Sequence, residues 1–250
     1  MHWFETGLLT REENLVGLMA VNRDMVVQAE SLDHADRIVL DMNSSESPVH
    51  GQQEGSAYNG HFESVCYHPL FLFNGHGDCL AAKLRSGNVH SADHWDELLV
   101  PELERQQAEG KRVAFRADAA FAKPEICDAL EQRDVAYAIR MPANESLEWK
   151  IADLLFRSPG RPSRKPLVRY KSFHISGGEL DAAATNRGES RASCWRVVPA
   201  RRLHRHKSFL SLPSRAVVRF YNTRGTAEQW IKERKQAAHW TRLSCHLSGE

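Results

Sequence analysis

Four residues near the C-terminal end of the sequence have the types and spacing to hold a metal ion beside a phosphate backbone. Tyr221, Arg224, Glu228 and Lys235 follow the pattern Tyr-x2-Arg-x3-Glu-x6-Lys. On a helix, Arg224, Glu228 and Lys235 share one stripe, so that a carboxylate lies between two cations. The alternative is an ordinary amphipathic helix with solvated charges, which most helices containing Arg, Glu and Lys would be.

Two more acids stand at the ends of apolar segments. Asp41 ends the run Ile38-Val-Leu-Asp41, and Asp118 ends Phe115-Arg-Ala-Asp118. Carboxylate oxygens are the ligands that Mg2+ prefers, and metal-binding acids often lie at strand ends. Asp118 alone is weak support, because an Asp in such a place often only caps a helix or a turn.

Several longer segments carry a family resemblance. Together with the motifs above, the segments 51–61, 66–74, 87–93 and 240–245 are similar to DDE-type insertion-sequence transposases, the cut-and-paste group with the Tyr-Arg-Glu-Lys signature. The resemblance extends over most of residues 3–245. Agreement over that length makes chance similarity a poor explanation.

The resemblance implies a function and a set of roles. Asp118 becomes the second catalytic acid and Glu228 the third, with Tyr221, Arg224 and Lys235 contacting DNA phosphates. Such enzymes use two Mg2+ ions to cleave a strand and join its 3′-hydroxyl to target DNA. The implied partners are DNA, as element ends and as target, and a second copy of the chain in a homodimer.

The first acid is where the sequence departs from that family. Members have Asp immediately before Ser-Ser, and here that position is Asn43. An amide oxygen brings no negative charge, so metal affinity should fall. Asp41, two residues away on the same strand face, is the alternative ligand, and a metal set of Asp41, Asp118 and Glu228 follows. Loss of activity is the favoured interpretation.

Composition and charge set further bounds. The chain has 250 residues, 42% of them hydrophobic, which is enough for a core. It has no apolar run of membrane-spanning length and no signal peptide, which indicates a cytoplasmic protein. Its five cysteines have neither a disulfide nor a zinc pattern and are interpreted as buried free thiols.

The predicted elements form an α/β domain with a ribonuclease-H-like mixed sheet flanked by helices. Strand 37–42 comes first, then an antiparallel meander of 62–67, 70–73 and 79–84. A helix capped by Ser91 extends to Gly110 and places Trp95 and three leucines inward. Strand 111–118, a helix opened by Pro124 with Ile126, Ala129 and Leu130 inward, and strand 135–140 complete the order.

Residues 157–215 interrupt this pattern as a basic insertion between the second and third acids. They contain 14 Lys and Arg against 3 Asp and Glu, whereas residues 1–156 contain 13 against 26. A cationic segment suits nucleic-acid binding, although a solvated basic linker explains the charge equally well. Their composition predicts irregular or disordered chain.

A reading-frame change would explain this degraded insertion. The segment Arg202–Phe209 has a back-translation in which another frame reads Gly-Phe-Ile-Val-Thr-Asn-Leu, an apolar strand. The hypothesis is that about 174–210 is translated out of frame. The coding DNA decides this, because the alternative frame must contain a strand-like sequence.

The predicted parts are therefore an N-terminal helical remnant (1–30), the first part of the catalytic core (31–156), the basic insertion (157–215) and a C-terminal catalytic helix with Glu228 (216–250). A truncated member of the family is the resulting interpretation. Three functions compete: an active transposase, an inactive remnant that retains at most DNA binding or dimerisation, and a self-contained nuclease of the same fold, which is the least favoured.

Overall fold

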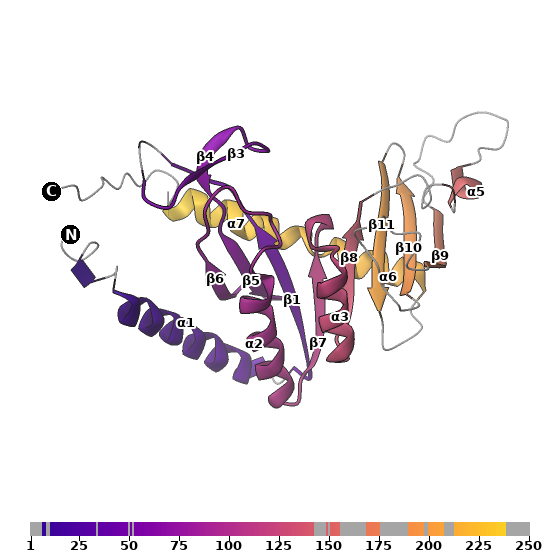
Figure 1. The fold of residues 1–250 in the computed structure, drawn as a ribbon. Coiled ribbons are helices and arrows are strands. Elements are labelled where there is room, and N and C mark those ends of the chain that lie inside the picture. Colours follow the sequence, from indigo (N-terminus) through magenta and orange to yellow (C-terminus); the bar gives the residue numbers. More distant parts are fainter. Residues whose placement is uncertain are drawn as a thin grey trace.

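A mixed β-sheet with β1 (Arg37–Ser44) at its centre organises the chain (Figure 1). The computed structural model describes residues 7–8, 11–33, 35–49, 51, 53–142, 149, 151–155, 169–175, 190–197, 200–207 and 213–238. Within the sheet, β5 (Leu70–Asn74) pairs antiparallel with β1, and β6 (Cys79–Lys83) pairs antiparallel with β5. On the other side, β7 (Arg112–Ala117) and β8 (Ala136–Met141) follow in parallel. The order β6-β5-β1-β7-β8 with these directions is that of the ribonuclease-H-like fold, which confirms the predicted fold class.

The alternation of side chains along β1 assigns its residues to two faces. Leu40 and Met42 are fully buried in the main hydrophobic core, while Asp41 and Asn43 point to the opposite face. β5 is buried throughout, because helices cover both faces of the sheet at that strand. The polar residues of β1 therefore lie on one face, away from the main core.

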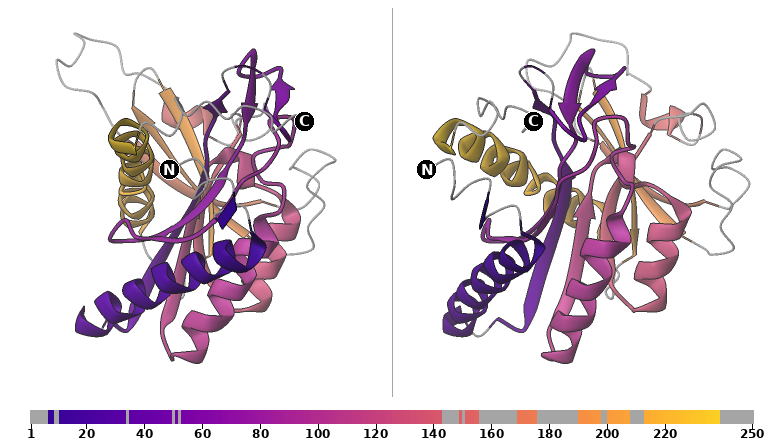
Figure 2. Two further views of the ribbon diagram at one scale, coloured as in Figure 1. Left: turned by 90° about the vertical axis from the view of Figure 1, so that its left-hand side faces the viewer. Right: turned by 60° about the vertical axis from the view of Figure 1, so that its left-hand side comes forward.

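The helices α2 (Trp95–Ala108) and α3 (Pro124–Gln132) cover the first face (Figure 2). Leu98, Leu99 and Leu103 of α2 are buried, as predicted. The predicted Ser91 cap is wrong, because α2 begins after His94, whose backbone is in the left-handed region. The Asp93 side chain accepts a hydrogen bond from the His90 backbone N–H. In α3 the buried residues are Ile126, Cys127 and Leu130; Ala129 is only half-buried.

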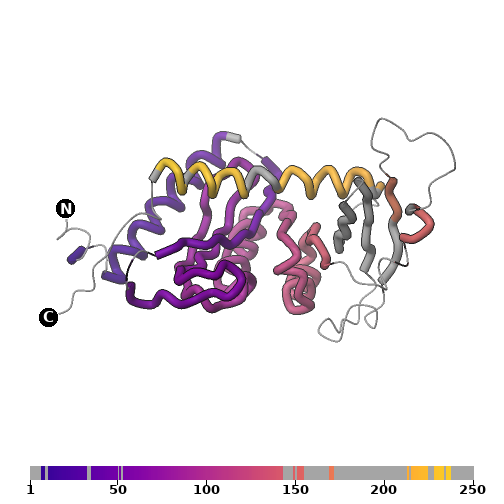
Figure 3. Tube along the Cα trace, turned by 90° about the horizontal axis from the view of Figure 1, so that it is seen from above, coloured from indigo at the N-terminus to yellow at the C-terminus, as the bar shows by residue number. Residues whose placement is uncertain are grey.

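The second face carries α6 (Ser214–Asn222) and α7 (Gly225–Ala238), which follow one another along one side of the sheet (Figure 3). The expected single helix through Arg224 and Glu228 is interrupted at residues 223–224. Thr223 Oγ1 donates to the Phe220 carbonyl over 2.7 Å, and glycine at 225 disfavours a helix interior. Arg224 therefore lies at a junction between two helices.

The predicted meander is only partly correct. An antiparallel meander is formed by β1, β5 and β6. The predicted strand at 62–67 corresponds to β4 (Ser64–Tyr67), which pairs instead with β2 (Ser47–Pro48) and β3 (Ala57–Asn59) in a separate three-stranded sheet. Periodicity predicts a strand without saying which strand it pairs with. This small sheet lies beyond the C-terminal end of β1 (Figure 1), and Asn43 is the second-last residue of that strand.

The prediction of irregular chain at 157–215 differs from the structure at three segments. β9 (Arg169–Ile175), β10 (Ser190–Val197) and β11 (Ala200–Lys207) extend the sheet, with β11 antiparallel to β8. The edge of β8 offers unpaired backbone groups that a following strand of almost any composition can satisfy. Residues 157–168, 176–189, 198–199 and 208–212 lie outside the described residues, and the reading-frame hypothesis stays a hypothesis.

Two short helices and a long one complete the description. The 3-10 helix η2 (Ala119–Phe121) follows β7, and α5 (Ala152–Leu155) precedes β9. α1 (Glu12–Asp33) contacts the sheet edge at β6, buries only Val26 among its large apolar residues, and leaves Leu15, Leu18, Met25 and Leu32 exposed. In the described part, no helix is both long and apolar enough to cross a membrane. Cys66 and Cys127 are buried free thiols, as predicted, whereas the thiol of Cys79 is only half-buried.

Gly77 sets how closely α7 packs on the sheet. It has a φ of 99°, and a Cβ added there would lie 2.6 Å from Cε2 of Trp230 in α7. We expect Gly77→Ala to lower the free energy of unfolding by about 1–2 kcal/mol from backbone strain and roughly 1–3 kcal/mol more from the clash. Urea unfolding measures the loss.

Gly110→Ala is the matched control, because Gly110 has a φ of 78° and no atom within 4 Å of the added Cβ. Comparison of the two variants separates the free-energy cost of backbone strain from that of the steric clash. Equal losses in the two variants would contradict a close packing of Trp230 on the β5–β6 turn.

Candidate active site

Asp118 and Glu228, distant in sequence, approach the same guanidinium. Asp118 follows β7, and its Oδ1 accepts a hydrogen bond from the Ala120 backbone N–H over 2.9 Å. Its Oδ2 lies 3.7 Å from Arg224 Nη2. Glu228, in the first turn of α7, places Oε1 at 3.2 Å from Arg224 Nη1. The structure thus gathers the two acids around an arginine.

Arg224 is enclosed by these contacts. Its side chain is 5% exposed, and Nη2 also donates to the Met42 carbonyl of β1 over 3.4 Å. Its Nε is buried and has no hydrogen-bond partner among the described residues. Arg224 thus contacts carboxylates and a backbone carbonyl of the protein itself, and its expected role as a DNA phosphate contact stays a prediction.

Asn43, the residue at the position expected for the first acid, carries no charge. Asn43 is buried near the end of β1, in register with Phe71 of β5. Asp41 lies on the same face but is fully buried and bound to Arg116, whose Nε donates to Oδ1 over 2.8 Å and whose Nη2 donates to Oδ2 over 2.5 Å. Burial raises the pKa of the Asp41 carboxyl, while the bonds and charge of Arg116 oppose that rise.

Arg116 is the structural residue that sequence reasoning missed. Besides holding Asp41, its Nη1 donates to the Phe220 carbonyl over 2.8 Å and to Thr223 Oγ1, and its guanidinium lies 5.0 Å from the Phe220 ring centroid. One side chain therefore joins β1, β7 and the end of α6. The signal in the sequence was a basic residue inside an apolar segment that is predicted to form a buried strand.

Tyr221 and Lys235 also make contacts within the protein. Tyr221 is 6% exposed and packs with Val217 and Ala138, and burial raises its pKa. Lys235 is half-buried, donates to the Glu46 backbone carbonyl, and has its pKa lowered by burial. Their roles as DNA contacts stay predictions.

The residues present do not fit a two-metal centre. Such a centre needs several carboxylates converging on two cations, and the described residues contain no group of three or more Asp, Glu, His or Cys arranged to hold a metal ion. Asp41 is bound by Arg116, Asn43 is neutral, and a cation lies between Asp118 and Glu228. No catalytic step through a metal follows from this arrangement.

With this sheet order, an Asp after β7 and a Glu on α7, the chain has a ribonuclease-H-like fold. The chain belongs to the family described as transposase DDE domain group 1, whose model matches residues 4–249. The family resemblance seen in the motifs is thereby confirmed. Members of this family generally use divalent metal ions. No curated protein sequence matches the chain significantly.

Two solved structures are similar in part. A piggyBac transposase synaptic complex with hairpin DNA has a TM-score of 0.44 and 14% identity, covering 79% of this chain and 40% of that chain. The NurA nuclease from Sulfolobus solfataricus has a TM-score of 0.39 and 10% identity, covering 96% of this chain and 98% of that chain. The family assignment rests on the sequence match, because both TM-scores are below 0.5. The chain spans less than half the length of the transposase.

Removing the Asp41 carboxylate should destabilise the fold. In Asp41→Asn the Arg116 guanidinium stays buried without its counter-ion, which costs about 3–5 kcal/mol of unfolding free energy. Asp36→Asn, at an exposed position before β1, is the control and should change stability by less than about 0.5 kcal/mol. Similar losses in both variants, measured by urea unfolding, would show that the Asp41–Arg116 pair contributes no special stability.

Arg224 should oppose metal binding even after the first acid is restored. We expect Asn43→Asp to bind Mn2+ or Mg2+ weakly, and Asn43→Asp with Arg224→Gln to bind at least roughly tenfold more tightly, since a cation beside both acids is gone. Calorimetric titration measures the affinities. The control variant combines Asn43→Asp with Lys232→Gln, because Lys232 is an exposed cation on α7. An equal gain in metal affinity in this control would rule out a specific effect of Arg224.

Proposed function

We propose that this chain is a transposase-derived DNA-binding domain whose metal-dependent strand cleavage is impaired. The observation that carries the proposal is Asn43, a neutral and buried amide near the end of β1, at the position where the resemblance expects the first catalytic acid. Arg224 lies 3.7 Å from Asp118 and 3.2 Å from Glu228 and partly neutralises the two remaining acids. Because Arg224 belongs to the Tyr-Arg-Glu-Lys signature itself, the impairment is assigned to Asn43.

The parent reaction of this proposal is Mg2+-dependent DNA cleavage followed by strand transfer. In it, two Mg2+ ions held by three carboxylates would activate water or a 3′-hydroxyl and stabilise the leaving oxygen. Asp118 and Glu228 are the candidate second and third acids, and Asn43 takes the place of the first. Asp41 as a substitute ligand would have to leave Arg116, and the cost of unpairing that buried arginine makes the substitution unfavourable.

DNA is the proposed partner because of the family and because of the distribution of charge. Residues 216–250 contain 6 Lys and Arg against 3 Asp and Glu, and Lys232 on α7 is exposed. Exposed cations attract a phosphate backbone regardless of its sequence. A homodimer pairing two DNA ends belongs to the same proposal.

DNA binding without nicking is the expected behaviour. The purified chain should bind a labelled duplex with a Kd of roughly 1–100 µM near physiological salt, weakening as salt rises. A supercoiled plasmid incubated with it and Mg2+ or Mn2+ should stay intact, and Glu228→Gln should not change either result. Metal-dependent nicking by the unaltered chain that Glu228→Gln abolishes would refute the proposed impairment.

A further inference from the structure

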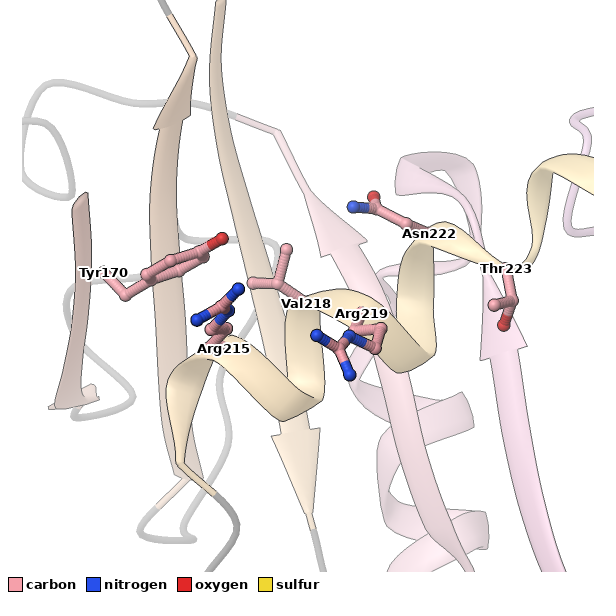
Figure 4. A pocket seen from close by; sticks show the side chains of 6 residues that line it. All are labelled: Tyr170, Arg215, Val218, Arg219, Asn222 and Thr223. Atoms are coloured by element: carbon pink, nitrogen blue, oxygen red, sulfur yellow. The ribbon is translucent and has the colours of Figure 1, made fainter. Parts of the chain in front are cut away.

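A groove of about 350 Å³ lies between α6 and β9 (Figure 4), and neither Asp118 nor Glu228 lines it. Its lining comes from one face of α6 and from one strand residue. Tyr170 extends from β9 toward α6, with the Arg215 guanidinium next to it, and the Arg219 guanidinium projects from the helix further along. The complete lining consists of Tyr170, Arg215, Val218, Arg219, Asn222 and Thr223.

The two arginines of this groove have no counter-ion in the described part of the chain. Arg215 and Arg219 are both exposed, and no ion pair joins either of them to a described carboxylate. Arg105, Arg133 and Arg224, by contrast, each pair with a glutamate. Like charges at i and i+4 of a helix repel by a few tenths of a kcal/mol, so an anion between them would remove a cost that the free protein bears.

The spacing of the arginines suits a chain of phosphates better than one isolated anion. A rise of 1.5 Å per residue separates Arg215 and Arg219 by about 6 Å along α6. Each guanidinium can bind a phosphate with two parallel hydrogen bonds. Asn222, one turn further, adds an amide that can donate to the same ligand.

The groove also leads toward the acids. Its last lining residue is Thr223, whose hydroxyl receives a hydrogen bond from Arg116 and which precedes Arg224 in the chain. A strand held along α6 would therefore approach the junction at Arg224, whose own guanidinium is buried. This continuity favours a polymer over a small phosphate compound.

We propose that Arg215 and Arg219 bind neighbouring phosphates of a nucleic-acid strand that follows α6 toward Arg224. The proposal rests on the proposed DNA-binding function and assigns part of it to this groove. Neither arginine is part of the Tyr-Arg-Glu-Lys motif. The Tyr170 side chain borders the strand at its far end.

The test compares Arg215→Gln/Arg219→Gln with Arg23→Gln/Arg112→Gln, which removes two exposed arginines from α1 and from the start of β7. Binding of a fluorescein-labelled DNA duplex is measured by anisotropy between about 50 and 200 mM salt. The groove variant should bind roughly 10- to 100-fold more weakly at low salt. Its slope of log K against log salt should be smaller by about two, one unit for each lost phosphate contact.

The control variant should keep the affinity and slope of the unaltered chain. All four substituted positions are exposed, and thermal unfolding should be the same in both variants, so a fold defect would be visible. If the groove variant keeps the original slope while DNA still binds, the groove assignment is wrong and the proposed function stands.

A second arm distinguishes nucleic acid from free phosphate compounds. Sodium tripolyphosphate is added during thermal unfolding of the unaltered chain and the groove variant. If the unaltered chain does not bind DNA but is stabilised by tripolyphosphate through these arginines, the groove takes a free polyphosphate and both proposals are overturned. If neither ligand binds, both are overturned as well.

Discussion

The buried ion pair between Asp41 and Arg116 is the contact on which the geometry of the site depends. It joins the two central parallel strands, and the same guanidinium reaches the Phe220 carbonyl and Thr223 Oγ1 at the end of α6. Because α7 follows within two residues, the positions of Arg224 and Glu228 relative to the sheet are fixed by this arginine. A buried charge that loses its partner costs several kcal/mol, so the arrangement tolerates few substitutions at either residue.

The same contact restricts the chemistry. Of the acids on this face of the sheet, Asp41 is committed to Arg116, and Asp118 and Glu228 share Arg224. The group of Asp118, Glu228 and Arg224 carries one net negative charge, whereas three free carboxylates would carry three. Attraction for a divalent cation falls in proportion. With Asn43 at the position of the first acid, no further carboxylate offsets the charge of Arg224 at this site.

The sequence predicted those features that depend on local pattern. Short apolar runs located β1, β5, β6, β7 and β8, and Pro124 located the start of α3. It did not predict the partner of β4, since pairing is a property of the tertiary fold. It did not predict β9, β10 and β11, because backbone pairing with the edge of β8 requires no apolar period. Arg116 was missed because its partners come from β1 and α6, far away along the chain.

The motif spacing singled out candidate residues but could not decide which partner each one takes. Tyr221 and Arg224 are as consistent with a protein interior as with a DNA surface, and here both are buried. For DNA to bind Arg224, a phosphate must replace two carboxylates and the Met42 carbonyl. Binding at Arg215 and Arg219 breaks no ion pair with a described residue. Phosphates should therefore engage the exposed arginines first, and the buried motif only where the gain there exceeds the cost of opening its ion pairs.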